Sequence, residues 1–150
     1  MCTIKSVTTS SNDNRVETVL RSFLEGYVTL QQLQELLQDY MTIAFIDEGH
    51  REIRNNSLVG TIRIPVYEDH LRRILHQYIS GQMLDTDLSN WAAMIFLSEV
   101  FVPKGETEEE RWQAGEGAVW DILQRLMTPK IFDNLNKQVA QRYVYMLADL

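Results

Sequence analysis

Cysteine is nearly absent from the sequence, and this absence limits how the chain can be held together. Cys2 is the one cysteine among 150 residues, and it stands beside the first methionine. One cysteine can form neither an internal disulfide nor a cysteine-based zinc site. A chain of this length, with 45% hydrophobic residues, buries enough apolar surface to fold without such links. We therefore expect a core held by packing, with no cofactor and no structural metal.

Long apolar runs are also missing. No uninterrupted apolar stretch is long enough to cross a bilayer, and no basic segment followed by an apolar run marks a signal peptide. From these absences we expect no membrane partner and a cytoplasmic location.

Basic residues are in the minority. Lys and Arg number 14 against 21 Asp and Glu, which gives a net charge of -7. A surface that binds nucleic acid needs a concentrated field of Lys and Arg, so we expect no nucleic-acid partner. The simplest interpretation of the acidic balance is ordinary surface charge that keeps a small domain soluble. The alternative is recognition of a basic protein partner.

The start of the chain differs in composition from the rest. It is rich in Ser, Thr and Asn and has few apolar anchors, so ordering it would cost more entropy than burial returns. We predict that residues 1–14 are a flexible N-terminal tail and that residues 15–150 form a single helical domain.

Apolar residues recur at helical spacing over most of the remaining chain. Residues three and four positions apart line one side of a helix, which is the pattern of an apolar face packed on a core. The segments with this spacing are 16–27, 30–41, 67–79, 88–96, 112–126 and 131–147. The pattern predicts a mostly α fold, a single bundle of about six helices.

The stretch from Val66 to Phe101 shows the pattern most clearly and is typical of a helical hairpin. Gly81 stands where a left-handed residue would end the first helix. Asp85 or Thr86 can cap the second helix, whose apolar stripe includes Trp91.

Two capping boxes mark further helix starts. Thr29 with Gln32 and Thr107 with Glu110 have the spacing at which two side chains cap two backbone N–H groups reciprocally. Gly26 ends the preceding helical segment. The glutamates beside Thr107 also favour a helix N-terminus, because the helix dipole attracts negative charge there.

The segment between the second and third helical stretches has a different pattern. Ile43, Phe45 and Ile46 form a short apolar run, and residues 61–64 alternate as a strand does. We predict a small two-stranded ribbon between residues 43 and 64. Its strands would be joined by an exposed connection over residues 49–60.

No arrangement of residues indicates catalysis or metal binding. His70 and His76 are six positions apart, whereas two ligands on one face of a helix lie three or four apart. Most carboxylate pairs fall at expected helix starts, where capping and the helix dipole account for them. Gly115 and Gly117 form a GxG without the strand that precedes a dinucleotide site, and they predict a kinked or split helix.

A resemblance to a known family rests on the helical hairpin and on the segments after it. The stretch HLRRILHQYISGQMLDTDLSNWA, with WDILQRLMTP and a last amphipathic helix after it, resembles small helical proteins of bacterial toxin and immunity systems, with colicin-D-type immunity proteins as the nearest comparison. Gly81, Asp85, Leu88, Trp91 and Ala92 mark the matching turn and helix start. The resemblance implies a non-enzymatic protein that occludes a basic toxin domain by complementary charge.

Under this hypothesis the acidic residues form the partner surface. Trp91 and Trp120 lie on apolar stripes and are expected in the core, whereas Trp112 comes after a run of acidic residues and can be exposed beside them. The candidate partner-binding residues are Glu106, Glu108, Glu109, Glu110 and Trp112, with Asp85 and Asp87 as a second group.

Two other functions fit the sequence. The chain could bind a small ligand, or act as an enzyme, through a pocket between helices with His70, His76 and Asp69 near its mouth. A deep pocket with converging polar groups would favour that hypothesis.

The third hypothesis is a self-associating structural protein. A homodimer would bury Tyr143, Tyr145 and Met146 of the last helix against a symmetry mate. A large apolar two-fold interface would favour it.

Overall fold

Helices hold more than half of the described residues, which confirms the prediction of a mostly α chain. The structure is a computed structural model that describes residues 14–132 and 134–148. The predicted tail lies outside the described residues except for Asn14, which is helical. The helices are one over residues 14–24, α2 (Leu30–Leu36), η1 (Val59–Thr61, a 3-10 turn), α3 (Glu68–Ile79), α4 (Asp85–Leu97), α5 (Glu108–Gly115), α6 (Ala118–Met127) and α7 (Lys137–Ala148).

Helix α4 lies at the centre of the fold. It buries residues on most of its sides, including all of residues 91–95, and it contacts α2, α3 and α6. The indole Nε1 of Trp91 donates a 3.1 Å hydrogen bond to the carbonyl oxygen of Phe23, which ties the helix over residues 14–24 to α4. A helix that is apolar on most sides has to be covered by other elements. The helix over residues 14–24, α2, α3 and α6 therefore surround α4.

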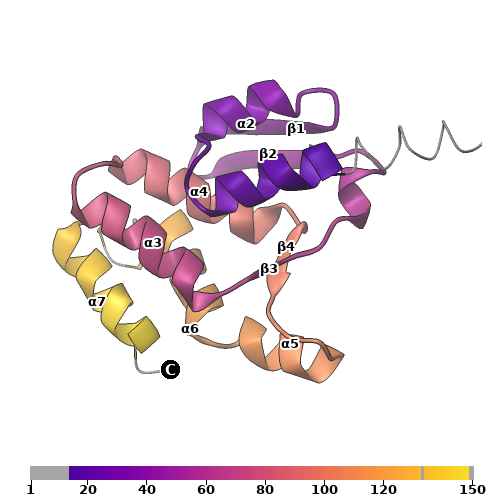
Figure 1. Ribbon diagram of the computed structural model, residues 1–150. Coiled ribbons are helices and arrows are strands. Elements are labelled where there is room, and N and C mark those ends of the chain that lie inside the picture. Colours follow the sequence, from indigo (N-terminus) through magenta and orange to yellow (C-terminus); the bar gives the residue numbers. More distant parts are fainter. Residues whose placement is uncertain (1–13, 133, 149–150) are drawn as a thin grey trace, which may run out of the picture.

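Helices α3 and α7 form the layer beyond α4. They lie side by side (Figure 1), and α7 also contacts α6. The residues that these two helices bury are Leu71, Ile74, Leu75 and Tyr78 of α3 and Val139, Ala140, Tyr143 and Leu147 of α7. The finer expectation of a single six-helix bundle is not confirmed, because two β-ribbons complete the fold.

The first ribbon begins at the predicted strand but has a different partner. Strand β1 (Met41–Asp47) pairs antiparallel with β2 (His50–Asn55), with Ile43 opposite Ile53. The predicted exposed connection over residues 49–60 is therefore wrong, because it contains β2. Two of the three partly buried residues of β2 are Arg51 and Asn55. These polar residues hide the apolar alternation on which a strand prediction depends.

The second ribbon is parallel. Strand β3 (Ile64–Val66) pairs with β4 (Phe101–Pro103), with Ile64 opposite Phe101, and the α3–α4 hairpin connects the two strands. The predicted strand over residues 61–64 overlaps β3 at Ile64 and pairs elsewhere than predicted. Strands of three residues are too short to show an alternating pattern in sequence.

Most predicted helix ends are confirmed. Gly26 and Gly81 have positive φ angles of 86° and 85°, as residues that end helices do. Thr29 and Gln32 form their capping box, and the break between α5 and α6 comes after Gly115.

The predicted cap of α4 is wrong. Its N-cap is Leu84 rather than Asp85 or Thr86. The carboxylate of Asp87 accepts the Leu84 backbone N–H at 3.3 Å, so the acidic side chain acts from within the first turn.

The two helix-ending glycines allow a matched test of backbone strain against crowding. Gly81→Ala should lower the free energy of unfolding by about 1 kcal/mol, because an added Cβ meets nothing within 4 Å and only the left-handed conformation opposes it. Gly26→Ala should cost about 2 to 3 kcal/mol, because its Cβ would also lie 2.9 Å from Cδ1 of the buried Ile74. Urea unfolding of both variants measures the difference, and equal losses would contradict it.

Candidate interaction surface

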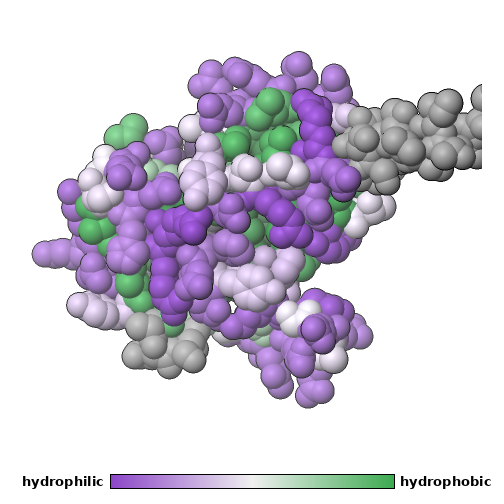
Figure 2. All heavy atoms as spheres, in the orientation of Figure 1, coloured by the Kyte–Doolittle hydropathy of each residue, from purple (hydrophilic) through white to green (hydrophobic). Residues whose placement is uncertain are grey.

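Helix α5 stands out from the rest of the fold. It buries none of its 8 residues and contacts β4 and α6. Figures 1 and 2 show it at the lower right as a projecting lobe whose visible residues are mostly hydrophilic. A helix this short is unstable by itself in water. Its ends must therefore be held by specific hydrogen bonds.

The start of α5 is held by a network around Glu110. The Glu110 backbone N–H donates to Thr107 Oγ1 at 3.1 Å, and its carboxylate accepts the N–H groups of Glu106 at 2.8 Å and Thr107 at 3.3 Å. Gly105 allows the close turn, because a Cβ there would lie 2.7 Å from the Cβ of Glu110. The predicted capping box is confirmed. The Glu110 carboxylate is thus engaged within the lobe.

Trp112 is the apolar centre of this lobe. Its side chain is 69% exposed, although tryptophan usually buries most of its surface. The exposed carboxylates of Glu106, Glu108 and Glu109 belong to the same lobe. We call residues 106–115 the acidic lobe. It unites the first group of residues that the sequence singled out.

The second predicted group lies elsewhere. Asp85 and Asp87 belong to the first turn of α4, at the opposite end of that helix from the strand that leads to α5 (Figure 1). Asp85 Oδ1 accepts a 2.5 Å hydrogen bond from the hydroxyl of Tyr78. Burial and this carboxylate together raise the pKa of Tyr78 well above its ordinary value. The structure thus separates these aspartates from the acidic lobe.

A groove separates the acidic lobe from the body of the protein. Its volume is about 820 Å³, and it lies between the β3–α3 junction, the segment before α5 and the start of α6. The residues that give it apolar walls are Pro65, Val66, Ala114, Ala118, Val119 and Trp120. Trp120 also contacts Phe96 of α4, with ring centroids 5.9 Å apart. The groove can therefore accept apolar groups beside an acidic rim.

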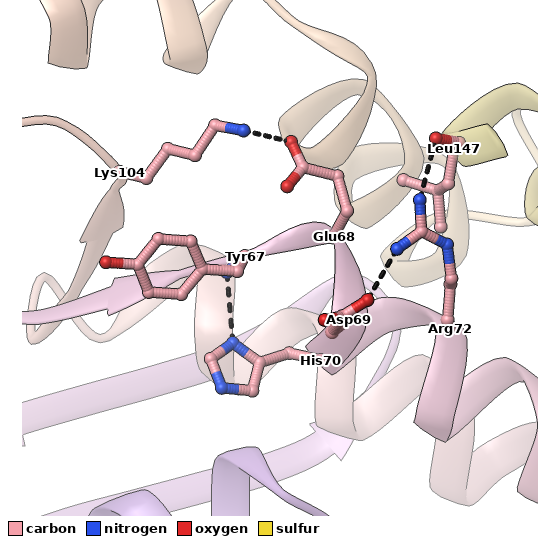
Figure 3. Close-up of polar contacts among 7 residues, drawn as sticks. All are labelled: Tyr67, Glu68, Asp69, His70, Arg72, Lys104 and Leu147. Carbon is pink, nitrogen blue, oxygen red and sulfur yellow. Dashed lines mark hydrogen bonds and ion pairs between the residues drawn. The ribbon is translucent and has the colours of Figure 1, made fainter. Parts of the chain in front are cut away.

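An ion pair spans the groove. The Lys104 ammonium and the Glu68 carboxylate point toward one another (Figure 3) and join the segment before α5 to the start of α3. The Glu68 side chain is 17% exposed. Burial by itself would raise the pKa of Glu68, but the hydrogen bond and charge of Lys104 lower it overall below its ordinary value. Glu68 therefore stays ionised at neutral pH.

The first turn of α3, which forms one wall of the groove, is capped by a histidine. The Tyr67 backbone N–H donates to His70 Nδ1 at 3.0 Å (Figure 3). Since Nδ1 accepts a hydrogen bond, the cap requires neutral His70. Two residues further along the same helix, Arg72 donates to Asp69 at 2.5 Å and to the carbonyl oxygen of Leu147 at 3.0 Å, which ties α3 to α7.

The electrostatic surroundings of His70 favour this neutral form. Burial is the largest influence and lowers the pKa of His70 below its ordinary value of 6.5. The charges of Arg73 and Arg21 act in the same direction, while those of Glu25 and Asp69 oppose them.

The other residues that the sequence singled out lie apart from these features. His70, His76 and Asp69 do not line the groove, and His76 lines a shallow hollow of about 450 Å³ along α3. Tyr143 is 2% exposed and belongs to the core of the chain, whereas Tyr145 is 64% exposed. No group of three or more His, Cys, Asp or Glu side chains within residues 14–132 and 134–148 could hold a metal ion.

Comparisons of the chain with protein-family models, with curated proteins and with solved structures find no match. In the part of the chain that the structure describes, no helix is both long enough and apolar enough to span a membrane.

The histidine cap predicts a pH-dependent stability. The unfolded chain takes up a proton on His70 near pH 6.5, before the folded chain does, because burial lowers the pKa in the fold. The contribution of His70 to the free energy of unfolding is thus complete above that pH and is lost as the pH falls below it. In the variant His70→Gln, the side chain still accepts the hydrogen bond but does not titrate. Between pH 7.5 and pH 5, the free energy of unfolding of the wild type should therefore fall by about 1 kcal/mol relative to that of the variant.

Urea unfolding at each pH measures this difference. The matched control is His76→Gln, which removes an exposed histidine from the last turn of the same helix, far from the cap. If His70→Gln and His76→Gln gave the same pH profile, the capping role of His70 would be refuted.

Proposed function

We propose that this chain is a non-enzymatic protein-binding domain whose acidic lobe docks a basic protein. The observation that carries the proposal is an exposed tryptophan on a helix with no buried residue, accompanied by the exposed carboxylates of Glu106, Glu108 and Glu109. Tryptophan is among the residues that most often dominate binding energy, when surrounding groups exclude water from it. Trp112 is placed to act in that way.

The charges around Trp112 set the chemistry of the partner. Carboxylates that stay hydrated at a rim attract Lys and Arg and speed the encounter, without the large desolvation cost of a buried charge. The groove behind the lobe offers apolar walls and the fixed Glu68–Lys104 pair. A partner that fits both features presents basic side chains on either side of an apolar group.

The resemblance to immunity-type proteins supports a specific form of this proposal. The partner would then be the basic domain of a bacterial toxin, which this chain would bind and occlude. The setting would be the cytoplasm, without a nucleic-acid or membrane partner. The net charge of -7 is compatible with such a partner.

Affinity capture with matched variants tests the proposal. The tagged chain would be used to capture proteins from its own host at low salt, followed by mass spectrometry. Trp112→Ala should weaken binding of a captured basic protein about 30-fold. Glu108→Gln with Glu109→Gln should weaken it about 3-fold to 10-fold and reduce its salt dependence.

The control removes the same amount of charge elsewhere. Glu35→Gln with Asp39→Asn alters two exposed carboxylates in and after α2 and should leave binding unchanged at high salt and nearly so at low salt. Growth rescue by co-expression would then test the toxin-inhibiting form. Equal binding by the lobe variants and the control, or capture of no basic protein, would overturn the proposal.

A further inference from the structure

A second cavity opens where three separate elements meet. The turn between β1 and β2, the start of α4 and the connection between α6 and α7 enclose about 550 Å³. This volume lies within the usual range of small-molecule sites. The cavity shares no lining residue with the groove beside the acidic lobe. It can therefore serve a function that is independent of the lobe.

Arg51 of β2 lies in the lining of this cavity and is held rigidly. Its Nη1 donates to the carbonyl oxygen of Met127 at 2.6 Å, and its Nη2 donates to Ser89 Oγ at 3.0 Å and to Asn90 Oδ1 at 3.3 Å. Its guanidinium carbon lies 5.6 Å from the ring centroid of Phe45. These bonds fix a positive charge at the junction of the hairpin with α4 and α6.

Two buried polar atoms of the cavity residues have no hydrogen-bond partner within the described chain. They are Nε of Arg51, which is a donor, and Oε1 of Glu48, which is an acceptor. Both residues line the cavity. A buried donor or acceptor without a partner costs free energy, so such pairs in native proteins usually meet water or a ligand. Neither atom is open to the cavity, so a ligand there would meet the charges of these two side chains rather than these two atoms.

The remaining charged groups of the cavity divide into engaged and unengaged ones. Asp47 Oδ1 accepts hydrogen bonds from His50 and from the Gly49 backbone, and Asp85 Oδ1 accepts one from Tyr78. Lys130 also lines the cavity and is exposed. Glu48, whose charge also acts on Arg51, thus provides a negative group, and the exposed Lys130 provides a positive one.

Apolar groups complete the cavity. Phe45, Ile46, Pro129 and Leu135 are part of its lining. Ile46 is 82% exposed at the tip of the hairpin, and Ile131, next to Lys130 in the sequence, is 74% exposed. The lining side chains give the cavity an apolar side.

We propose that this cavity binds a small zwitterion of the α-amino-acid class that has an apolar side chain. The ammonium group of the ligand donates to Glu48, and its carboxylate accepts from Lys130 beside the positive charge of Arg51. The apolar side chain lies against Phe45 and Ile46. Opposite charges in one small site favour a molecule that has both charges over one that has either alone.

NMR titration of the full chain tests this assignment, with L-leucine and L-phenylalanine as separate probes. Each is compared with the amine that lacks its carboxylate (isoamylamine, phenethylamine) and with the acid that lacks its ammonium group (isocaproic acid, hydrocinnamic acid). At least one amino acid should give saturable backbone amide shifts around residues 45–51 and 85–90, with a dissociation constant below about 1 mM. Both of its truncated analogues should bind at least about tenfold more weakly.

Matched variants distinguish binding in the cavity from an effect of the net charge of the chain on binding. Glu48→Gln should weaken binding of that amino acid at least about tenfold, and Lys130→Met should weaken it about 3-fold to 10-fold. Glu52→Gln removes the same charge from an exposed residue of β2 outside the cavity and should bind like the wild type. An unchanged amide spectrum away from the hairpin shows that each variant is folded.

Three results would overturn the assignment. They are the absence of saturable shifts with either amino acid up to about 10 mM, equal binding of an amino acid and its amine or acid analogue, and equal binding by the Glu48→Gln and Glu52→Gln variants.

Discussion

The burial of helix α4 is the constraint on which the rest of the structure depends. Apolar residues occupy most of its sides, so α2, α3, α6 and the helix over residues 14–24 are drawn around it. A polar residue is covered as well, because Ser89 is 7% exposed and its hydroxyl accepts a hydrogen bond from Arg51 of the β-hairpin. The indole N–H of Trp91 meets a carbonyl oxygen rather than water. Beyond its exposed first turn, this helix has little surface left for a partner. A partner would therefore bind at that turn or at the elements around the helix.

Helix α5 shows the opposite arrangement. It contributes no buried residue, so the hydrophobic effect does little to hold it, and local hydrogen bonds at Thr107 and Glu110 do most of that work. The indole of Trp112 consequently remains in solvent, where its apolar surface contributes nothing to the fold. A protein that keeps such a residue exposed on a capped helix beside carboxylates has the parts of a binding surface, an apolar centre and a charged rim.

The helices could be predicted from the sequence because their causes are local. Apolar spacing, the capping box at Thr29 and the glycines at positions 26 and 81 act within a few residues, and the structure agrees with each. The strands depend on distant residues. Arg51 lies on the inner face of β2 because its hydrogen bonds go to residues 38 to 76 positions away, and Asn55 because it donates to Ser98. Strand β3 forms only because the α3–α4 hairpin returns the chain to it. No pattern within a short window could reveal such partners.

The candidate surface could be predicted only where its residues are close in sequence. The glutamates before Trp112 stand together in the sequence, but their different roles cannot be predicted from it. The Glu110 carboxylate caps the helix, while Glu106, Glu108 and Glu109 face solvent. Glu68 and Lys104, 36 residues apart, could not be linked in advance. The exposed carboxylates and the Trp112 indole would act on a partner through two different physical effects. Hydrated carboxylates act at long range, so in the proposed complex they would govern the rate of encounter and its salt dependence. The indole acts only on contact, when water leaves it, so it would govern how long that complex lasts.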